Sequence, residues 1–158
     1  MPARQGKIIR DYMDDKFWLT PPSLYEQLNN EFGFVFDPCP YPRPEGFNGI
    51  AIPWGISNFV NPPFRRKDAA FGAGPTAFVR KAIAEKELGH SSVLLLPVQS
   101  YVNMLIEAGA ELRSVGRVRW INASANENWE QTGFTHSKSA NEWKSPVSVC
   151  CFILRGKA

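Results

Sequence analysis

The 158-residue sequence has few of the residues and patterns that build metal centres, disulfide frameworks or membrane helices. Its three cysteines, Cys39, Cys150 and Cys151, match no metal-ligand spacing, and their odd number forms no complete set of disulfides. No apolar run approaches the roughly 20 residues of a membrane helix, and the first residues form no apolar signal core. We therefore expect a cytoplasmic protein without a bound metal or a membrane partner.

Internal repeats and low-complexity tracts are also absent, and the net charge of +3 is small. A weak positive charge is not the pattern of a protein that binds nucleic acid through its overall charge, so local basic clusters matter more. The hydrophobic fraction of 44% is typical of a globular protein, and the length suits one domain. We predict a single catalytic domain over residues 17–158, preceded by a flexible polar arm at residues 1–16.

Segments of helical periodicity alternate with short apolar segments along most of the chain. Leu24, Leu28 and Phe32 fall at helical spacing and predict a helix that begins between Thr20 and Ser23. Two more helices are expected, at residues 77–88 and 101–108. Strands are expected at residues 34–36, 59–60, 92–97, 112–121 and 147–154. This alternation predicts an α/β fold with a mostly parallel sheet and helices on both of its faces.

One apolar run ends abruptly at Asn61, Pro62, Pro63 and Phe64. A strand cannot continue through two prolines, because each lacks an N–H group and has a fixed φ. Asn61 is therefore expected at the carboxyl end of its strand, which is the edge where open α/β sheets bind ligands. The side-chain carbonyl of Asn61 and the backbone carbonyl of Pro62 are neutral acceptors, and Phe64 adds a flat apolar face. Together they suit a planar ring with an exocyclic amino group.

Methyl transfer to the N6 atom of adenine is the chemistry that such a group of residues would serve. The N6 lone pair is delocalised into the ring, so this nitrogen is a poor nucleophile. Hydrogen bonds from its two protons to Asn61 and Pro62 would favour a tetrahedral nitrogen and stabilise the positive charge that develops on it. Phe64 would stack on the base after it leaves the duplex. Asn-Pro-Pro is also an ordinary turn sequence, and this structural interpretation stands beside the functional one.

Thr20 and Asp37 are two more polar residues at the ends of predicted elements. Thr20 precedes Pro21 and can cap a helix whose first turn accepts proline. Asp37 ends a predicted strand, directly before Pro38 and Cys39. Its carboxylate could bind a cationic or hydroxyl-bearing ligand at the sheet edge, or it could cap the turn that follows.

Taken in order, these segments resemble the phage-type DNA N6-adenine methyltransferases, the Dam-like family common in phages and prophages. The resemblance runs along most of the chain and rests on Trp18-Leu19-Thr20-Pro21, Glu31-Phe32-Gly33-Phe34, Asp37-Pro38-Cys39, Phe59-Val60-Asn61-Pro62-Pro63-Phe64, Leu94-Leu95-Leu96-Pro97 and Gly116-Arg117-Val118-Arg119-Trp120. It implies a compact Rossmann-like methyltransferase fold, S-adenosylmethionine as cofactor and double-stranded DNA as partner. The location would be the host cytoplasm if the protein is phage-encoded.

The resemblance also implies roles for individual residues. The catalytic residues that hold the adenine would be Asn61, Pro62, Pro63 and Phe64. The cofactor would be held by Trp18, Thr20, Pro21, Asp37, Pro38 and Cys39. Whether Asp37 meets the methionine amino group or the ribose hydroxyls of the cofactor stays open. Directly after the catalytic segment, Arg65, Arg66 and Lys67 are expected to contact DNA phosphates.

The sequence departs from the family pattern in three respects. The stretch Val98-Gln99-Ser100-Tyr101-Val102-Asn103 stands where the family usually has a polar, Thr-rich stretch. Asn48-Gly49-Ile50 stands where family members often have Asp-Gly-Leu, and there is no separate target-recognition domain, so loops at residues 65–75 and 122–146 would read the DNA. Two alternatives therefore remain. One is an inactive methyltransferase-fold module that binds DNA or a host protein. The other is an N-methyltransferase acting on RNA or on a protein glutamine, whose carboxamide offers the same two N–H groups. Nothing in the sequence indicates an oligomeric state.

Overall fold

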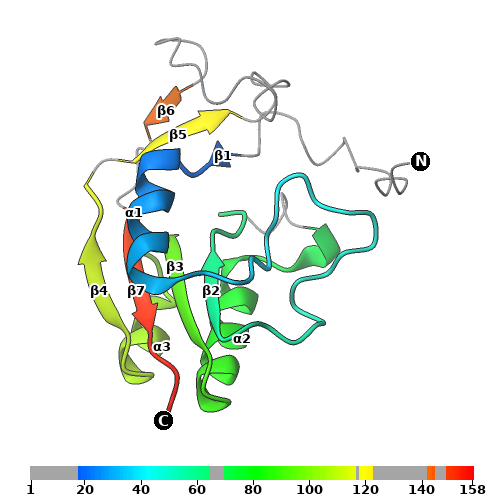
Figure 1. Ribbon diagram of the computed structural model, residues 1–158, viewed down its shortest axis with the longest axis vertical. Helices are drawn as coiled ribbons and strands as arrows, with labels where there is room; N and C mark the ends of the chain where they lie inside the picture. The colour runs from blue at the N-terminus through cyan, green and yellow to red at the C-terminus, as the bar shows by residue number, and fades with distance from the viewer. Residues whose placement is uncertain (1–17, 65–69, 117, 123–141, 145–148) are drawn as a thin grey trace.

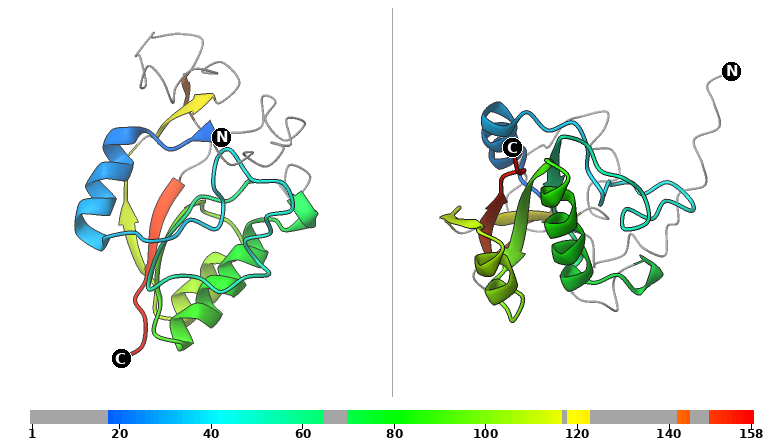
Figure 2. Two further views of the ribbon diagram at one scale, coloured as in Figure 1. Left: turned by 45° about the vertical axis from the view of Figure 1, so that its right-hand side comes forward. Right: turned by 90° about the horizontal axis from the view of Figure 1, so that it is seen from below.

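A computed structural model of the chain describes residues 18–64, 70–116, 118–122, 142–144 and 149–158. The predicted arm at residues 1–16 and the basic cluster Arg65, Arg66 and Lys67 lie outside the described residues. Within them, three α-helices and a four-stranded mixed sheet form a small α/β structure, accompanied by a separate three-stranded sheet (Figure 1). Figure 2 shows the helices and the large sheet from two further sides.

The four strands of the large sheet lie in the order β2-β3-β7-β4. Their bounds are β2 (Ser57–Val60), β3 (Ser91–Pro97), β7 (Val149–Leu154) and β4 (Glu111–Ser114). Strands β2 and β3 are parallel, whereas β7 runs antiparallel to both of its neighbours, β3 and β4. The predicted Rossmann-like, mostly parallel sheet is therefore wrong, because only one of the three strand pairs in the described sheet is parallel.

The connections between the strands explain this difference. A parallel pair needs a crossover of a dozen or more residues, usually a helix. Helix α2 (Pro75–Glu87) provides that crossover between β2 and β3. After β3, the short helix α3 (Val102–Glu107) leads to the edge strand β4, and β7 later enters between β3 and β4 in the opposite direction.

The predicted strand at residues 34–36 joins the edge of the sheet through a single parallel bridge, between Phe36 and Asn58. The Val35 N–H group donates to the Ser57 carbonyl at 2.9 Å, and the Phe59 N–H group donates to the Phe36 carbonyl at 3.0 Å. This segment and β2 run in the same direction. The residues that follow them, Asp37 and Asn61, therefore leave the sheet toward the same end.

The small sheet has the order β1-β5-β6, with all neighbours antiparallel. It consists of β1 (Trp18–Leu19), β5 (Arg119–Asn122) and β6 (Glu142–Lys144). The single strand predicted at residues 112–121 is divided between the two sheets, and Gly116, with a φ of +67°, lies between its parts. In Figure 1 the small sheet lies beyond the ends of β2 and β3 to which these strands point.

Alternate residues of the large sheet face two separate apolar clusters, as the period of a strand requires. The face that packs on α2 and α3 carries Val60, Leu94, Leu96, Phe152 and Leu154. The face that packs on α1 (Pro22–Phe32) carries Phe59, Val93, Leu95, Cys151 and Ile153. Cys151, in the strand predicted at residues 147–154, is fully buried in the second cluster.

The three helices lie close to their predicted positions. Helix α2 begins two residues before the predicted start, at Pro75, and a short 3-10 helix, η3 (Ala70–Gly72), precedes it. Helix α1 has Pro21 as its N-cap and no side-chain cap, so the expectation that Thr20 caps this helix is wrong. Among the helices of the described residues, none combines the length and apolar character needed to cross a membrane.

Candidate active site

Asn61 follows the last residue of β2 and is half-buried. Its Nδ2 group donates a hydrogen bond to Thr20 Oγ1 at 3.0 Å. This is the one hydrogen bond that the Asn61 side chain makes to the described residues, and none of these residues donates to its Oδ1 atom. The side chain thus turns its donor group toward the protein and retains its acceptor.

Pro62 supplies a second acceptor directly after Asn61. The residue is buried, and no N–H group among the described residues donates to its backbone carbonyl. Two consecutive residues at the end of β2 therefore offer acceptors that the described part of the fold does not use.

Phe64 lies at the border between this strand end and the apolar cluster on the α1 side of the sheet. Its ring is half-buried and meets the ring of Trp120 edge-on, with centroids 5.4 Å apart and an interplanar angle of 80°. Trp120 is fully buried, and its indole N–H group has no partner among the described residues. The sequence did not predict this support for Phe64, because Trp120 belongs to a distant strand.

The segment from Trp18 to Pro21 passes close to Asn61, as the Thr20 hydrogen bond shows. The backbone of Trp18 pairs with Asn122 in the small sheet, and Pro21 begins α1. Of the cofactor residues that the resemblance implies here, the structure therefore brings Thr20 to the predicted catalytic residue Asn61. Two motifs 41 residues apart in the sequence meet at one point.

Asp37 caps the turn that follows it. One carboxyl oxygen accepts the Cys39 N–H group at 2.7 Å. Burial raises the pKa of Asp37 to about 7, although the Cys39 hydrogen bond acts in the opposite direction. Burial, with a smaller contribution from Asp37, also raises the pKa of the Cys39 thiol well above its usual range. The thiol stays protonated at neutral pH, which argues against a role as a nucleophile.

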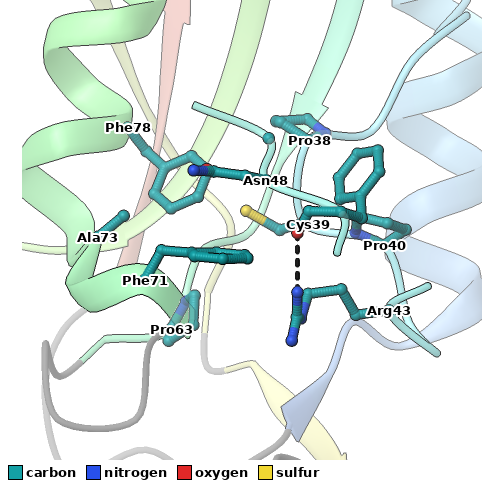
Figure 3. A pocket seen from close by; sticks show the side chains of 11 residues that line it. Pro38, Cys39, Pro40, Arg43, Asn48, Pro63, Phe71, Ala73 and Phe78 are labelled. Carbon is teal, nitrogen blue, oxygen red and sulfur yellow. Dashed lines mark hydrogen bonds between the residues drawn. The ribbon is translucent and has the colours of Figure 1, made fainter. Parts of the chain in front are cut away.

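A pocket lies beside these strand ends and contains residues of both motifs (Figure 3). Pro38 and Cys39 contribute from one motif and Pro63 from the other. The pocket is shallow and partly open to solvent. Asp37 and Asn61 are not part of its lining. Each motif contributes to the pocket only through the residues that follow Asp37 and Asn61 in the sequence.

The rest of the pocket lining is mostly aromatic. Phe47, Phe71 and Phe78 line it, and Figure 3 shows the last two on the side of α2. Among the described residues of the lining, Arg43 is the one that carries a charge. Its guanidinium group donates to the Phe47 carbonyl at 2.8 Å and lies 5.3 Å from the centre of the Phe71 ring. The sequence did not single out Arg43, because its proline-rich segment has no periodic pattern.

Asn48, which stands where the resembled family often has aspartate, also lines the pocket. Its Oδ1 atom accepts the Ile50 N–H group at 3.1 Å, so it supports its own loop as Asp37 does. In the described part of the chain, no three histidine, cysteine, aspartate or glutamate side chains gather at a position that could hold a metal ion. The pocket lining therefore offers aromatic surfaces, one cation and one amide.

Comparisons of the chain with protein-family models, with curated proteins and with solved structures found no significant match.

Proposed function

We propose that this protein transfers a methyl group from S-adenosylmethionine to the N6 amino group of adenine in double-stranded DNA. The observation that carries the proposal is the acceptor pair at the end of β2, formed by Asn61 Oδ1 and the Pro62 carbonyl. Neither acceptor has a partner among the described residues. Two neutral acceptors side by side suit a group that carries two N–H bonds, and they disfavour a carbonyl oxygen, which has none.

The two acceptors would act on the nitrogen of the substrate. By accepting both N6 protons they hold the amino group in place and stabilise the positive charge that grows on it during transfer. Such preorganised contacts are each worth about 100- to 1,000-fold in rate in other enzymes. Phe64, held edge-on by Trp120, offers a fixed ring on which a base taken out of the duplex can stack.

We assign the cofactor to the pocket beside Pro63 because of the chemistry of its lining. S-adenosylmethionine supplies the electrophilic methyl group when it is bound. Flat surfaces for its purine ring are provided by Phe47, Phe71 and Phe78, and Arg43 provides a counter-charge for its carboxylate. In this proposal Asp37 acts indirectly, because its carboxyl supports the turn that carries Pro38 and Cys39 into the lining.

Contacts to DNA are part of the same proposal. Arg65, Arg66 and Lys67 follow Phe64 directly in the sequence, and their positive charges would bind phosphates next to the flipped base. These three residues lie outside the described ranges, so sequence position alone supports their role. A cytoplasmic location, where DNA and the cofactor occur together, belongs to this proposal as well.

The test is to incubate the protein with S-adenosylmethionine and duplex DNA of mixed sequence, and to measure N6-methyladenine by mass spectrometry after nuclease digestion. We expect methylation by the wild type and a loss of about 100- to 1,000-fold in Asn61→Ala. Asn103→Ala, which truncates an exposed asparagine on α3, is the matched control and should leave the rate unchanged. Circular dichroism checks that both variants fold.

Absence of N6-methyladenine with the wild type, or equal rates for wild type and Asn61→Ala, would contradict the proposal. An RNA duplex and a glutamine-containing peptide, added as competitors in separate reactions, test the choice of substrate. If either competitor inhibits as strongly as an added second DNA duplex does, we would assign the proposed activity to that competitor's class of substrate.

A second candidate function is a binding module that has the same site architecture without catalysis. It is favoured by one observation: Asp37 and Asn48, at the two positions linked to cofactor binding by the resemblance, both accept hydrogen bonds from their own loops. Calorimetry separates the two functions. Binding of DNA with no heat of binding for S-adenosylmethionine would favour the module, whereas binding of both would favour the enzyme.

A further inference from the structure

The contact between Thr20 and Asn61 places the Asn61 amide with its Nδ2 group toward Thr20. An asparagine side chain carries a donor group and an acceptor atom on opposite sides of one rotatable bond, so its recognition reverses when the amide flips. Thr20 Oγ1 receives the Nδ2 group at 3.0 Å, which leaves Oδ1 on the other side. Without this contact, no other described residue holds the amide in one of its two orientations.

Thr20 is itself held on both sides. On its N-terminal side, Leu19 pairs with Ile121 in the small sheet. On its C-terminal side, Pro21 and Pro22 have fixed φ angles and begin α1. The hydroxyl makes no bond to the start of the helix, because α1 has no side-chain cap. A half-buried hydroxyl between two fixed elements is well suited to position another side chain.

We propose that Thr20 is a positioning residue that holds the Asn61 side chain at the end of β2, so that its amide oxygen can accept a hydrogen bond from the exocyclic amino group of the substrate. This inference rests on the proposed function, but it assigns Thr20 a role other than the cofactor contact implied by the resemblance. Thr20 acts through Asn61 and touches neither the base nor the cofactor. Its loss should therefore lower the rate of methyl transfer without weakening the binding of cofactor.

The test compares Thr20→Val, which keeps the shape and removes the hydroxyl, with Thr20→Ser, which keeps the hydroxyl. We expect kcat to fall by about 10- to 100-fold in Thr20→Val, as when supporting residues around other sites are removed. Thr20→Ser should remain within about 3-fold of the wild type, because its hydroxyl can still receive Nδ2. The dissociation constant of S-adenosylhomocysteine, measured by calorimetry, should be unchanged in both variants.

Two results would overturn the role in positioning. Weaker binding of S-adenosylhomocysteine by Thr20→Val, at unchanged kcat, would make Thr20 a cofactor contact. An equal loss of kcat in Thr20→Val and Thr20→Ser would show that packing matters and the hydroxyl does not.

A readout that does not depend on activity separates this inference from the proposed function. The Asn61 side-chain amide gives a pair of proton signals in a nitrogen-correlated NMR spectrum, identified by their absence in Asn61→Ala. We expect this pair to shift in Thr20→Val and to stay in place in Thr20→Ser. If the wild type makes no N6-methyladenine but the pair shifts as expected, the proposed function fails and the positioning contact stands. An unshifted pair in Thr20→Val would overturn the inference in either case.

Discussion

Two carboxyl groups, the buried Glu85 and the half-buried Asp37, lie at different ends of the fold and are held in different ways. Glu85 is 1% exposed, near the end of α2 and next to the start of β3. It receives Lys81 Nζ at 2.5 Å, His90 Nδ1 at 2.6 Å and, at the longer distance of 3.4 Å, the Trp54 N–H group. Asp37, on the side where β2 ends, has one described hydrogen bond, from the Cys39 N–H group.

The pKa values of the two groups differ in direction for this reason. Burial acts to raise the pKa of Glu85, but the hydrogen bonds from Lys81 and His90 outweigh it, and the pKa is lowered. At Asp37 burial dominates, and the pKa rises to about 7. The charged form of Glu85 is thus stabilised by its partners, and the group contributes to the stability of the fold. At the end with Asp37, Asn61 and Pro62, the described residues give the polar groups few hydrogen-bond partners, as is common at functional sites.

The largest loss in the free energy of unfolding is expected from Glu85→Gln, which removes the charge of the side chain at almost constant size. Lys81 and His90 would then face an amide in place of a carboxylate. Removing one partner of a buried ion pair costs about 3 kcal/mol or more in the free energy of unfolding. Urea denaturation followed by circular dichroism measures this loss as a lower midpoint at unchanged slope.

Glu87→Gln is the matched control, two residues further along the same helix. Glu87 pairs with Lys157, but both side chains are more than half exposed. Exposed pairs contribute little, so this variant should lose at most about 1 kcal/mol. Equal midpoints for the two variants would show that the buried cluster is no stronger than a surface pair, and the contrast between the two ends of the fold would disappear.

Much of the helical structure was predictable from the sequence, because its signals are local. The periodicity of Leu24, Leu28 and Phe32 and the following Gly33, in a left-handed conformation with a φ of +59°, determine most of α1. Strand direction has no such local signal. The apolar run of β7 has the same pattern in either direction, and its position between β3 and β4 depends on contacts with distant residues.

The candidate site likewise combines features that have a local sequence signal with features that depend on distant residues. Pro62 and Pro63 end β2 by local chemistry, so the position of Asn61 at the strand end was predictable. The contact of Thr20 with Asn61 was not predictable, because Asn61 lies 41 residues away and the sequence around Thr20 suits a helix cap equally well. Arg43 was not predictable either, since its place in the pocket depends on how a proline-rich loop folds back over η3 and α2.

An intermediate loss in the free energy of unfolding is expected from Gly49→Ala. This variant tests how closely the Gly49 loop packs against the turn that follows Asp37. A Cβ atom on Gly49 would lie 2.0 Å from the Pro38 carbonyl oxygen, so the backbone of one segment must move. We expect a loss of about 2 kcal/mol in the free energy of unfolding, in the range of overpacked cores. The Gly49 carbonyl also receives Trp54 Nε1 at 2.7 Å, so tryptophan fluorescence should change as well.

Gly46→Ala, in the same loop, separates crowding from backbone conformation. A Cβ atom there meets nothing within 4 Å, but the φ of +74° disfavours alanine. This strain costs about 1 kcal/mol, and the fluorescence of Trp54 should be unaffected. A Gly49→Ala variant as stable as Gly46→Ala would mean that packing between Pro38 and Gly49 does not hold the turn of Asp37.

The smallest effect is expected from Asp37→Asn, and it depends on pH. The folded protein holds a proton on Asp37 up to about pH 7, whereas the unfolded chain releases it near 3.8. The folded state therefore binds more protons in this window, and the free energy of unfolding falls as the pH rises from 4 to 8. We expect this fall to be about 1–2 kcal/mol, less than for a fully buried group, because water screens a half-buried carboxyl.

Asparagine stays neutral and still accepts the Cys39 N–H group, so Asp37→Asn should match the wild type near pH 4 and exceed its stability near pH 8. Glu111→Gln tests a carboxyl group whose contribution to stability has the opposite dependence on pH. Hydrogen bonds from Arg113 and Arg155 lower the pKa of Glu111, so its contribution to stability is present at neutral pH and is lost as the pH falls. Urea denaturation of the three proteins from pH 3 to pH 8 measures both trends, because the loss for Glu111 begins only below its unfolded pKa of 4.5. Parallel curves for the wild type and Asp37→Asn would show that the Asp37 carboxyl is as well solvated as a surface group, and the contrast with Glu85 would then rest on Glu85 alone.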